Sequence, residues 1–246
     1  MKILGVIPVR YDSTRFPGKP LARVGGLPLI ERVWKQASGA TRLEKLLVAT
    51  DDVRIEEAVT RFGGEAVMTS KDLPSGTDRV WEAAQRTSAE VIVNIQGDEP
   101  LVTPEMVDSL VAGLEQDPQA QMTTLRFAMK GSEGAADPNV VKVVSNAAGW
   151  ALYFSRSLIP ARRGSPVEEH LWYKHLGLYA YRREALEQFV TWPPSELEET
   201  EELEQLRAIE HGVRIKVLDS PQDTIGVDTP EDLKRVEEIL KIAGSA

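Results

Sequence analysis

Three basic side chains stand close together near the start of the chain. Arg10, Arg15 and Lys19 share one short stretch with a single acid. They follow the apolar run 3–7, which is typical of a strand buried on both faces. A loop at the end of such a strand is where α/β proteins bind anionic ligands, and guanidinium and ammonium groups suit the oxygens of a triphosphate. These residues therefore predict a phosphate-binding loop.

This loop matches neither of two familiar phosphate motifs, the G-x-x-x-x-G-K-[ST] P-loop and the dinucleotide G-x-G-x-x-G. Its prolines, Pro17 and Pro20, remove backbone donors and stiffen the chain, whereas Gly18 permits positive φ or a close approach. From residue 10 to about residue 27 it exceeds the roughly 12–15 residues beyond which a structureless connection usually has a function. We expect a functional loop of another kind.

Two acidic residues follow predicted strands. Asp98 comes after the buried run 91–95, and Asp228 ends the short run 224–228. Each precedes a helix start that has a Thr cap and a Pro at the first helical position, Thr103-Pro104 and Thr229-Pro230. Because strand ends of a parallel sheet converge on one crevice, we expect the two carboxylates to face the basic loop. Such a pair could hold Mg²⁺ together with phosphate oxygens.

A third element is the turn Ser75-Gly76-Thr77-Asp78-Arg79 before a predicted helix. Its hydroxyl, backbone and guanidinium groups could read the edge of a nucleobase. Simple helix capping by Ser75 or Thr77 explains the same residues. The residue types alone leave both interpretations open.

Composition restricts the class of protein. The chain of 246 residues, with 42% hydrophobic and 27% charged residues, suits one large α/β domain. Its net charge of −9 disfavours nucleic-acid and membrane-surface binding. The absence of cysteine excludes disulfides and thiolate chemistry. No apolar segment approaches the roughly 20 residues of a membrane helix, and no signal sequence is evident, so we expect a cytoplasmic protein.

Periodicity predicts alternating strands and helices in the first half and a different pattern later. The predicted strands are 3–7, 46–49, 91–95, 122–127, 140–144, 151–154 and 176–181, and the predicted helices are 29–37, 55–62, 79–85, 196–210 and 230–242. The early βαβαβ order indicates a parallel sheet with right-handed crossovers. The turn-rich middle indicates antiparallel strands or a small insertion.

Long stretches of this sequence resemble the 3-deoxy-manno-octulosonate (Kdo) cytidylyltransferases. The resemblance rests on IPVRYDSTRFPGKPL at 7–21, SGTDR at 75–79, NIQGDEP at 94–100, VKVV at 141–144, HLGLY at 175–179, LEQLR at 203–207 and GVDTPEDL at 226–233. It spans nearly the whole chain in the family's order. It implies a three-layer α/β nucleotidyltransferase (nucleotide-diphospho-sugar transferase-like) fold, a mostly parallel sheet with an antiparallel insertion. Residues 1–246 would form a single domain, with a sugar-binding and dimerisation insertion at about 122–210.

The resemblance also implies a reaction. CMP would pass from CTP to Kdo, giving CMP-Kdo and diphosphate for lipopolysaccharide biosynthesis, in a homodimer that uses Mg²⁺ and binds neither nucleic acid nor membrane. The catalytic residues would be Arg10, Lys19, Asp98 and Asp228, with Asp98 and Asp228 as the metal ligands. The nucleotide would contact Pro8, Arg10, Arg15, Lys19, Ser75, Gly76 and Arg79. The sugar would contact Gln96, Arg156, His175, Glu204 and Gln205, with Arg156 on the Kdo carboxylate.

Several of these residues have a simpler interpretation. His175 could be a structural histidine, Arg156 an ordinary surface charge, and most of the acidic run 198–204 a solvated helix face. Three rival functions also remain at this point: CMP transfer to sialic acid, CMP transfer to 8-amino-Kdo, and a non-catalytic ligand-binding module on the same fold. The joint presence of Arg10, Lys19, Asp98 and Asp228 argues against the last of these.

Overall fold

The structure is a computed structural model that describes residues 1–12, 16–130, 134–161, 163 and 171–242. The chain divides into two compact units, which are described separately. The first comprises Met1–Asp108 and Thr224–Ala246, and the second comprises Ser109–Asp223. The α/β class with a parallel sheet and antiparallel strands in the second half is confirmed. A single domain with an insertion at about 122–210 stays a prediction.

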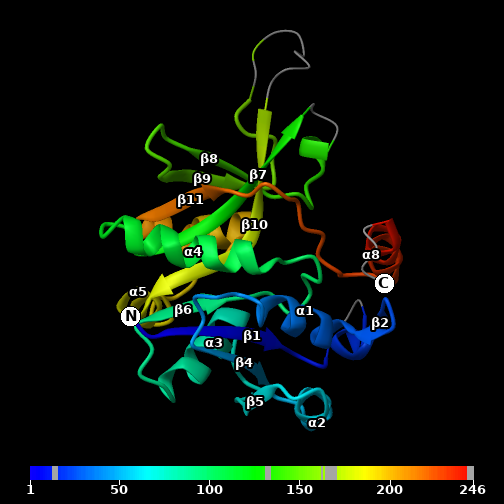
Figure 1. Ribbon diagram of the computed structural model, residues 1–246. Helices are drawn as coiled ribbons and strands as arrows, with labels where there is room; N and C mark the ends of the chain where they lie inside the picture. The colour runs from blue at the N-terminus through cyan, green and yellow to red at the C-terminus, as the bar shows by residue number, and fades with distance from the viewer. Residues whose placement is uncertain (13–15, 131–133, 162, 164–170, 243–246) are drawn as a thin grey trace. The chain divides into compact units, whose positions relative to one another are not determined.

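Four parallel strands form the sheet of the first unit, in the order β6, β1, β4, β5 (Figure 1). Their bounds are Ile3–Val9 for β1, Lys45–Thr50 for β4, Glu65–Met68 for β5 and Val91–Asn94 for β6. The central strand β1 has strands on both sides and is apolar along its length, and Val6 and Ile7 are wholly buried. The three strands predicted here are confirmed, whereas β5 was not predicted.

Helices connect these strands and end the chain. They are α1 (Leu29–Ala37), α2 (Val53–Arg61), α3 (Gly76–Gln85) and α8 (Pro230–Ile242), while α4 (Pro104–Gln116) begins in this unit and crosses its boundary. Both predicted threonine caps are present, because Thr103 Oγ1 accepts from Met106 N and Thr229 Oγ1 accepts from Asp232 N. All helices predicted in this unit are confirmed. In the described residues, no helix has the length and apolar content that a membrane crossing needs.

The long loop after β1 carries more structure than we expected. It contains a single 3-10 turn η1 (Lys19–Leu21) and a short hairpin of β2 (Arg23–Val24) and β3 (Leu27–Pro28). Gly18 enters the turn at φ +70°, a left-handed conformation that favours glycine. The second half of the loop therefore contains short elements that periodicity did not predict.

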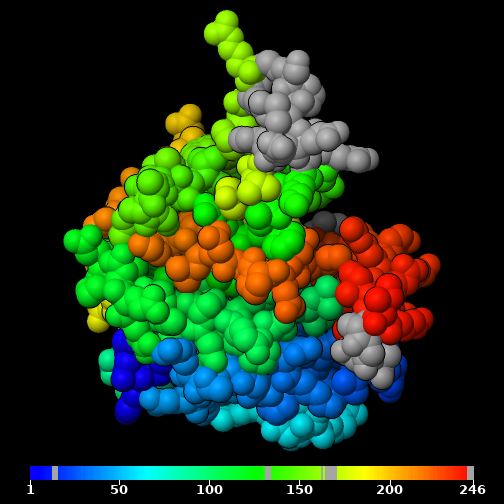
Figure 2. All heavy atoms as spheres, turned by 45° about the horizontal axis from the view of Figure 1, so that its top comes forward, coloured from blue at the N-terminus to red at the C-terminus, as the bar shows by residue number. Residues whose placement is uncertain are grey.

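A small apolar cluster joins the last helix to this hairpin. Val24 and Leu29 pack with Val227, Val236 and Leu240, and all five side chains are buried. Figure 2 shows the red atoms of α8 beside the blue N-terminal segment. This contact brings the segment before α8 to the hairpin that follows β1, although more than two hundred residues separate Val24 from Val227 in sequence.

The second unit contains mostly antiparallel strands. Its sheet has the order β11, β7, β10, β8, β9, and only β11 and β7 pair in parallel. The strands are β7 (Met122–Lys130), β8 (Lys142–Ser145), β9 (Ala151–Ser155), β10 (Leu171–Arg182) and β11 (Ile215–Asp219), with α5 (Arg183–Phe189) after β10. The predicted antiparallel strands are confirmed, whereas β11 and α5 were not predicted.

The acidic helix predicted at 196–210 is two helices. α6 (Glu196–Glu201) ends where Glu202 takes a left-handed conformation with φ +52°, and α7 (Gln205–Glu210) follows. The break has a tertiary cause, because the Arg156 guanidinium donates to the carbonyls of Glu201 and Glu202 at 2.8 and 3.2 Å. Helical periodicity cannot reveal such a contact. The prediction of one continuous helix was therefore wrong.

Candidate active site

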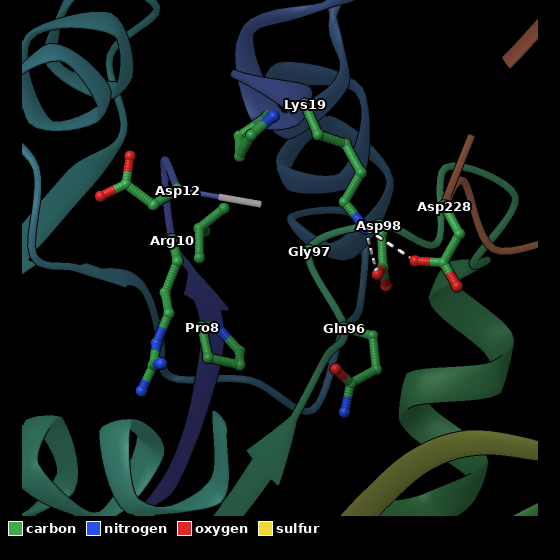
Figure 3. Close-up of a pocket in the computed structure, with 10 residues that line it drawn as sticks. Pro8, Arg10, Asp12, Lys19, Gln96, Gly97, Asp98 and Asp228 are labelled. Atoms are coloured by element: carbon green, nitrogen blue, oxygen red, sulfur yellow. Dashed lines mark hydrogen bonds and ion pairs between the residues drawn. The ribbon is translucent and has the colours of Figure 1, made fainter. Parts of the chain in front are cut away.

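Lys19 lies between two carboxylates from distant parts of the chain. Its Nζ is 2.8 Å from Asp98 Oδ2 and 3.2 Å from Asp228 Oδ1 (Figure 3). Burial by itself lowers the pKa of Lys19, but the two carboxylates together outweigh burial and raise the pKa above its ordinary value. Lys19 is thus a cation at neutral pH. It holds both acids at one point. Asp98 follows strand β6 as predicted, but residues 224–228 form no strand, so the strand-end prediction was wrong for Asp228.

A close approach of two loops places Asp98. It follows β6 in a turn in which Gly97 sits against the end of β1, so that a Cβ at Gly97 would lie 2.9 Å from the carbonyl oxygen of Pro8. Any side chain there would push the turn away. Glycine at position 97 therefore allows Asp98 to stand directly beside the phosphate loop.

The segment that carries Asp228 is tied to the same turn. The amide of Val227 donates to the carbonyl of Asp98 at 2.8 Å. On the other side, Asp232 Oδ2 accepts from the amides of Asp228 and Thr229 at 3.1 and 2.9 Å and from the Thr229 hydroxyl at 2.9 Å. Asp228 is therefore fixed at both ends of its short bridge.

A cleft opens beside these three side chains. One pocket of about 360 Å³ is lined by Pro8, Arg10, Lys19, Gln96, Asp98 and Asp228, among others. A second pocket of about 240 Å³ shares Pro8, Arg10 and Gln96 and reaches Ser75, Gly76 and Arg79. The first pocket alone is within the usual volume of a small-molecule site, roughly 300–1,000 Å³. The predicted phosphate and base contacts thus line adjoining hollows.

Arg10 stands where the two pockets meet. Its guanidinium donates to the carbonyl of Leu73, and Figure 3 shows it directed away from Lys19. The two cations therefore address different parts of the cleft. The predicted partner Arg15 lies outside the described residues.

The turn before α3 performs the capping that was one of its two interpretations. Ser75 Oγ accepts from the amides of Thr77 and Asp78 at 3.1 and 3.2 Å and donates to Asp78 Oδ2 at 2.7 Å. Ser75, not Thr77, is the cap. Gly76 begins the helix, and a Cβ added there would make only an ordinary contact with Pro8, at 3.8 Å.

Arg79 lines the second pocket but is wholly buried. Its guanidinium donates to Asp51 Oδ2 at 2.7 Å and to the Thr69 hydroxyl. Burial lowers the pKa of Arg79, and Asp51 acts in the opposite sense. This ion pair joins the end of β4 to α3. Arg79 thus supports the wall of the pocket, and its contact with a base stays a prediction.

The predicted sugar residues fall in both units. Gln96 lines both pockets of the first unit, and the other four belong to the second unit. His175 on β10 is 9% exposed, and its Nε2 lies 3.0 Å from the Thr124 hydroxyl. Its ring meets Phe154 edge-on, with centroids 4.9 Å apart. Burial lowers the pKa of His175 to about 3, so the ring is neutral at physiological pH.

Arg156 is an organising residue of the second unit and not an ordinary surface charge. Besides the carbonyls of Glu201 and Glu202, its guanidinium donates to the carbonyl of Pro138 at 3.3 Å. Its amide donates to Glu201 Oε2 at 2.9 Å. The bonds hold the α6–α7 junction, which leads directly into Glu204 and Gln205.

Gln205 and Glu204 occupy the start of α7. Gln205 is 8% exposed, and its Nε2 has no hydrogen-bond partner among the described residues. A buried amide donor without a partner is costly, which is a physical reason to expect a ligand oxygen there. Glu204 is the cap residue of α7. These positions fit the sugar prediction without testing it.

Two residues that hold the surroundings of Arg156 in place were not predicted from the sequence. Lys142 is wholly buried, and its ammonium donates to the carbonyls of Asp137, Val140 and Arg156. Glu201 accepts from the Ser155 hydroxyl at 2.6 Å, so the acidic run is not merely a solvated face. No local pattern marks either residue, because their partners are remote in sequence.

A family model and individual relatives assign this chain to the same family. A model of the cytidylyltransferases, described as "Cytidylyltransferase", matches residues 4–215. The 3-deoxy-manno-octulosonate cytidylyltransferase of Geobacter sulfurreducens is 47% identical, over 98% of this chain and 100% of the relative. That of Syntrophobacter fumaroxidans is 50% identical, over 98% of this chain and 97% of the relative. The chain belongs to the 3-deoxy-manno-octulosonate cytidylyltransferase family.

A solved cytidylyltransferase of this kind also shares the fold. The structure of CMP:2-keto-3-deoxy-manno-octonic acid synthetase complexed with CTP superposes with a TM-score of 0.93 at 42% identity, covering 99% of this chain and 100% of that one. The resemblance inferred from the sequence is therefore confirmed over nearly the full length.

The residues of this cytidylyltransferase fit a magnesium ion better than a transition metal. No cluster of three or more His, Cys, Asp or Glu side chains forms a cage among the residues that the structure describes. The cleft instead presents two carboxylates, Asp98 and Asp228, beside the ammonium of Lys19, which could also bind phosphate oxygens. Mg²⁺ is usually held by one or two carboxylates with phosphate oxygens and water.

Proposed function

We propose that this chain transfers CMP from CTP to Kdo and releases diphosphate. The observation that carries the proposal is Lys19 Nζ held between Asp98 and Asp228 at the edge of a cleft that Arg10 and Gln96 also line. A pair of cations and a pair of carboxylates suit a bound triphosphate with its metal. Family membership supplies the acceptor sugar.

The physical problem of this reaction is charge. An anionic sugar must approach the α-phosphorus of a polyanion, and diphosphate must leave. Arg10 and Lys19 would neutralise the phosphate chain at two separate points of the cleft, because the charged ends of their side chains lie apart in Figure 3. Preorganised charges are the main means of stabilising such a transition state.

Asp98 and Asp228 would hold Mg²⁺ between their two loops. When bound, the ion would polarise the phosphate oxygens. The contribution of the chain is the fixed placement of the two carboxylates, through the Val227 amide on one side and Asp232 on the other. Neither of these hydrogen bonds depends on the ion.

For the sugar we propose Gln96 in the first unit and Arg156, His175, Glu204 and Gln205 in the second. The unpartnered Gln205 amide supports this, as does the neutral ring of His175, which can bond a hydroxyl without repelling or attracting charge. We further propose a cytoplasmic homodimer.

Diphosphate release tests the function. The enzyme is supplied with Mg²⁺ and CTP, together with Kdo, 8-amino-Kdo, sialic acid or no sugar. Release that requires Kdo supports the proposal, whereas release with sialic acid alone contradicts it. Replacing CTP by ATP should abolish most of the release, since a site that pairs a base edge rejects a mismatched base by leaving its own polar groups unpaired. Equal rates with ATP and CTP would remove the assigned role of the Ser75 turn.

A further inference from the structure

Arg54 stands in the first turn of α2 and is not among the described residues that line the two pockets. Its Cζ lies 3.3 Å from the centroid of the Tyr11 ring. Tyr11 follows Arg10 directly and opens the loop that leads to Lys19. A guanidinium over an aromatic face is attracted by the ring quadrupole, so the contact joins α2 to the loop.

The cap of α2 orients this guanidinium. Arg54 Nε donates to Asp52 Oδ1 at 2.8 Å, and Nη2 donates to Asp52 Oδ2 at 2.6 Å. Asp52 is only 14% exposed, and its Oδ1 also accepts from the amide of Arg54 as the cap of the helix. Two parallel bonds between a fork and a carboxylate fix the guanidinium plane. Arg54 is thus held in place although it is itself 53% exposed.

The Tyr11 contact continues toward Lys19. The amide of Gly18 donates to the carbonyl of Tyr11 at 3.1 Å. A Cβ at Gly18 would lie 3.1 Å from Tyr11 Oη and 3.3 Å from its Cζ. Tyr11 and Gly18 therefore touch across the part of the loop that lies outside the described residues, and Gly18 is the residue that enters the turn carrying Lys19.

We infer that Arg54 is a positioning residue for the nucleotide phosphates. Held by Asp52, it fixes Tyr11, and Tyr11 fixes Gly18 and the turn that presents Lys19 to the cleft. Arg54 acts through these two residues and not by touching the nucleotide. The inference rests on the proposed function in one respect, since it takes the phosphates of CTP to bind at Lys19.

The test compares Arg54→Leu with Arg61→Leu, which removes the same charge from an exposed position in the last turn of the same helix. Calorimetry with CTP should show a Kd about two- to fivefold higher in Arg54→Leu, the effect of losing an exposed cation–π contact. Arg61→Leu should match the wild type. The KM for Kdo should be the same in all three proteins, and Arg54→Leu should still unfold in one cooperative transition, which a general structural defect would not allow.

Two further variants separate positioning from simple attraction between charges. Arg54→Lys keeps the charge but loses the planar fork on Asp52, so it should restore less than half of the lost affinity. Tyr11→Leu should weaken CTP binding as Arg54→Leu does, and the double variant should be no weaker than Tyr11→Leu alone. Full restoration by lysine, or additive losses in the double variant, would overturn the inference.

A measurement without nucleotide keeps the inference independent of the proposed function. Amide hydrogen exchange over peptides that contain Gly18 should be faster in Arg54→Leu than in the wild type and in Arg61→Leu, because the bond from Gly18 to Tyr11 opens more often. An unchanged exchange rate at Gly18 in Arg54→Leu would refute the positioning role of Arg54 even if CTP binds. Failure of the wild type to bind CTP would refute the proposed function and leave the exchange result standing.

Discussion

Replacing Asp98 by asparagine separates the function of this carboxylate from its contribution to the fold. Asp98→Asn keeps the volume of the side chain and the backbone carbonyl that accepts from Val227 at 2.8 Å. It removes one of the two ion pairs of Lys19, in which the Asp98 side chain is 34% exposed. A pair of such exposure contributes about 0.2–1 kcal/mol. The free energy of unfolding should therefore fall by about 1 kcal/mol or less.

The catalytic loss should be much larger. Asp98 and Asp228 both lie within 3.2 Å of Lys19 Nζ, and we propose that they hold one divalent cation together. Asp98→Asn would leave a single carboxylate for that cation. Removing one preorganised electrostatic group from an active site costs about 2.7–4 kcal/mol of transition-state stabilisation, which is a hundred- to thousandfold in kcat. Activity and stability should thus respond on different scales.

The assay is diphosphate release from CTP and Kdo over a series of Mg²⁺ concentrations, with urea unfolding of the same preparations. Asp219→Asn is the matched control, because Asp219 also makes one ion pair, to Arg126 Nε at 2.7 Å, and is not among the residues that line the pocket. It should lose neither activity nor Mg²⁺ response. Wild-type turnover of Asp98→Asn at low Mg²⁺, with the fold intact, would refute the assignment of Asp98 to the metal.

Three further measurements follow from the same structure. Arg156→Ala should raise the KM for Kdo about ten- to a hundredfold, which corresponds to the loss of one charge-assisted bond of about 1.5–3 kcal/mol. Its calorimetric Kd for CTP should stay unchanged. Arg10→Ala should instead weaken CTP binding, and the opposite pattern would exchange the roles of the two residues. His175 has a folded pKa of about 3 against an ordinary 6.5, so its contribution to stability is lost as pH falls below 6.5. Between pH 7 and pH 5 the free energy of unfolding of the wild type should therefore fall by about 2 kcal/mol more than that of His175→Asn. The pKa of Lys19 is raised in the folded state, so its contribution is complete below about pH 10.4 and declines as pH rises beyond that value; alkaline unfolding of Lys19→Met should lack this decline.

The sequence predicts the elements around the cleft well because strong local signals mark them. β1 is an uninterrupted apolar run, and α8 begins at a Thr-Pro pair whose cap forms as expected. The placement of Asp98 follows from a rule about parallel strand ends, because Asp98 comes after β6. The same rule was wrong for Asp228, because residues 224–228 form no strand. The segment of Asp228 is held instead by contacts with Asp98 and Asp232, which spacing does not reveal.

Long-range polar contacts decide what the sequence could not predict. Arg79 pairs with Asp51, 28 residues away, and becomes wholly buried, although an arginine in a helix start is usually expected at the surface. The break at Glu202 is held by Arg156 from 46 residues away, in a residue type that rarely adopts positive φ. Neither partner can be identified by periodicity or propensity.

The placement of Lys19 implies a link between metal and nucleotide. The oxygens that pair with Lys19 belong to the carboxylates that a divalent cation would use. A cation entering alone would have to displace a half-buried ammonium and leave it without a counter-charge, which is costly. A triphosphate that arrives with the cation offers the ammonium new oxygens at the same moment. With Asp98 and Asp228 as the metal ligands that we propose, Lys19 would keep the two acids together before substrate binds and would disfavour metal without nucleotide. The complete charge arrangement would then form only when CTP is present.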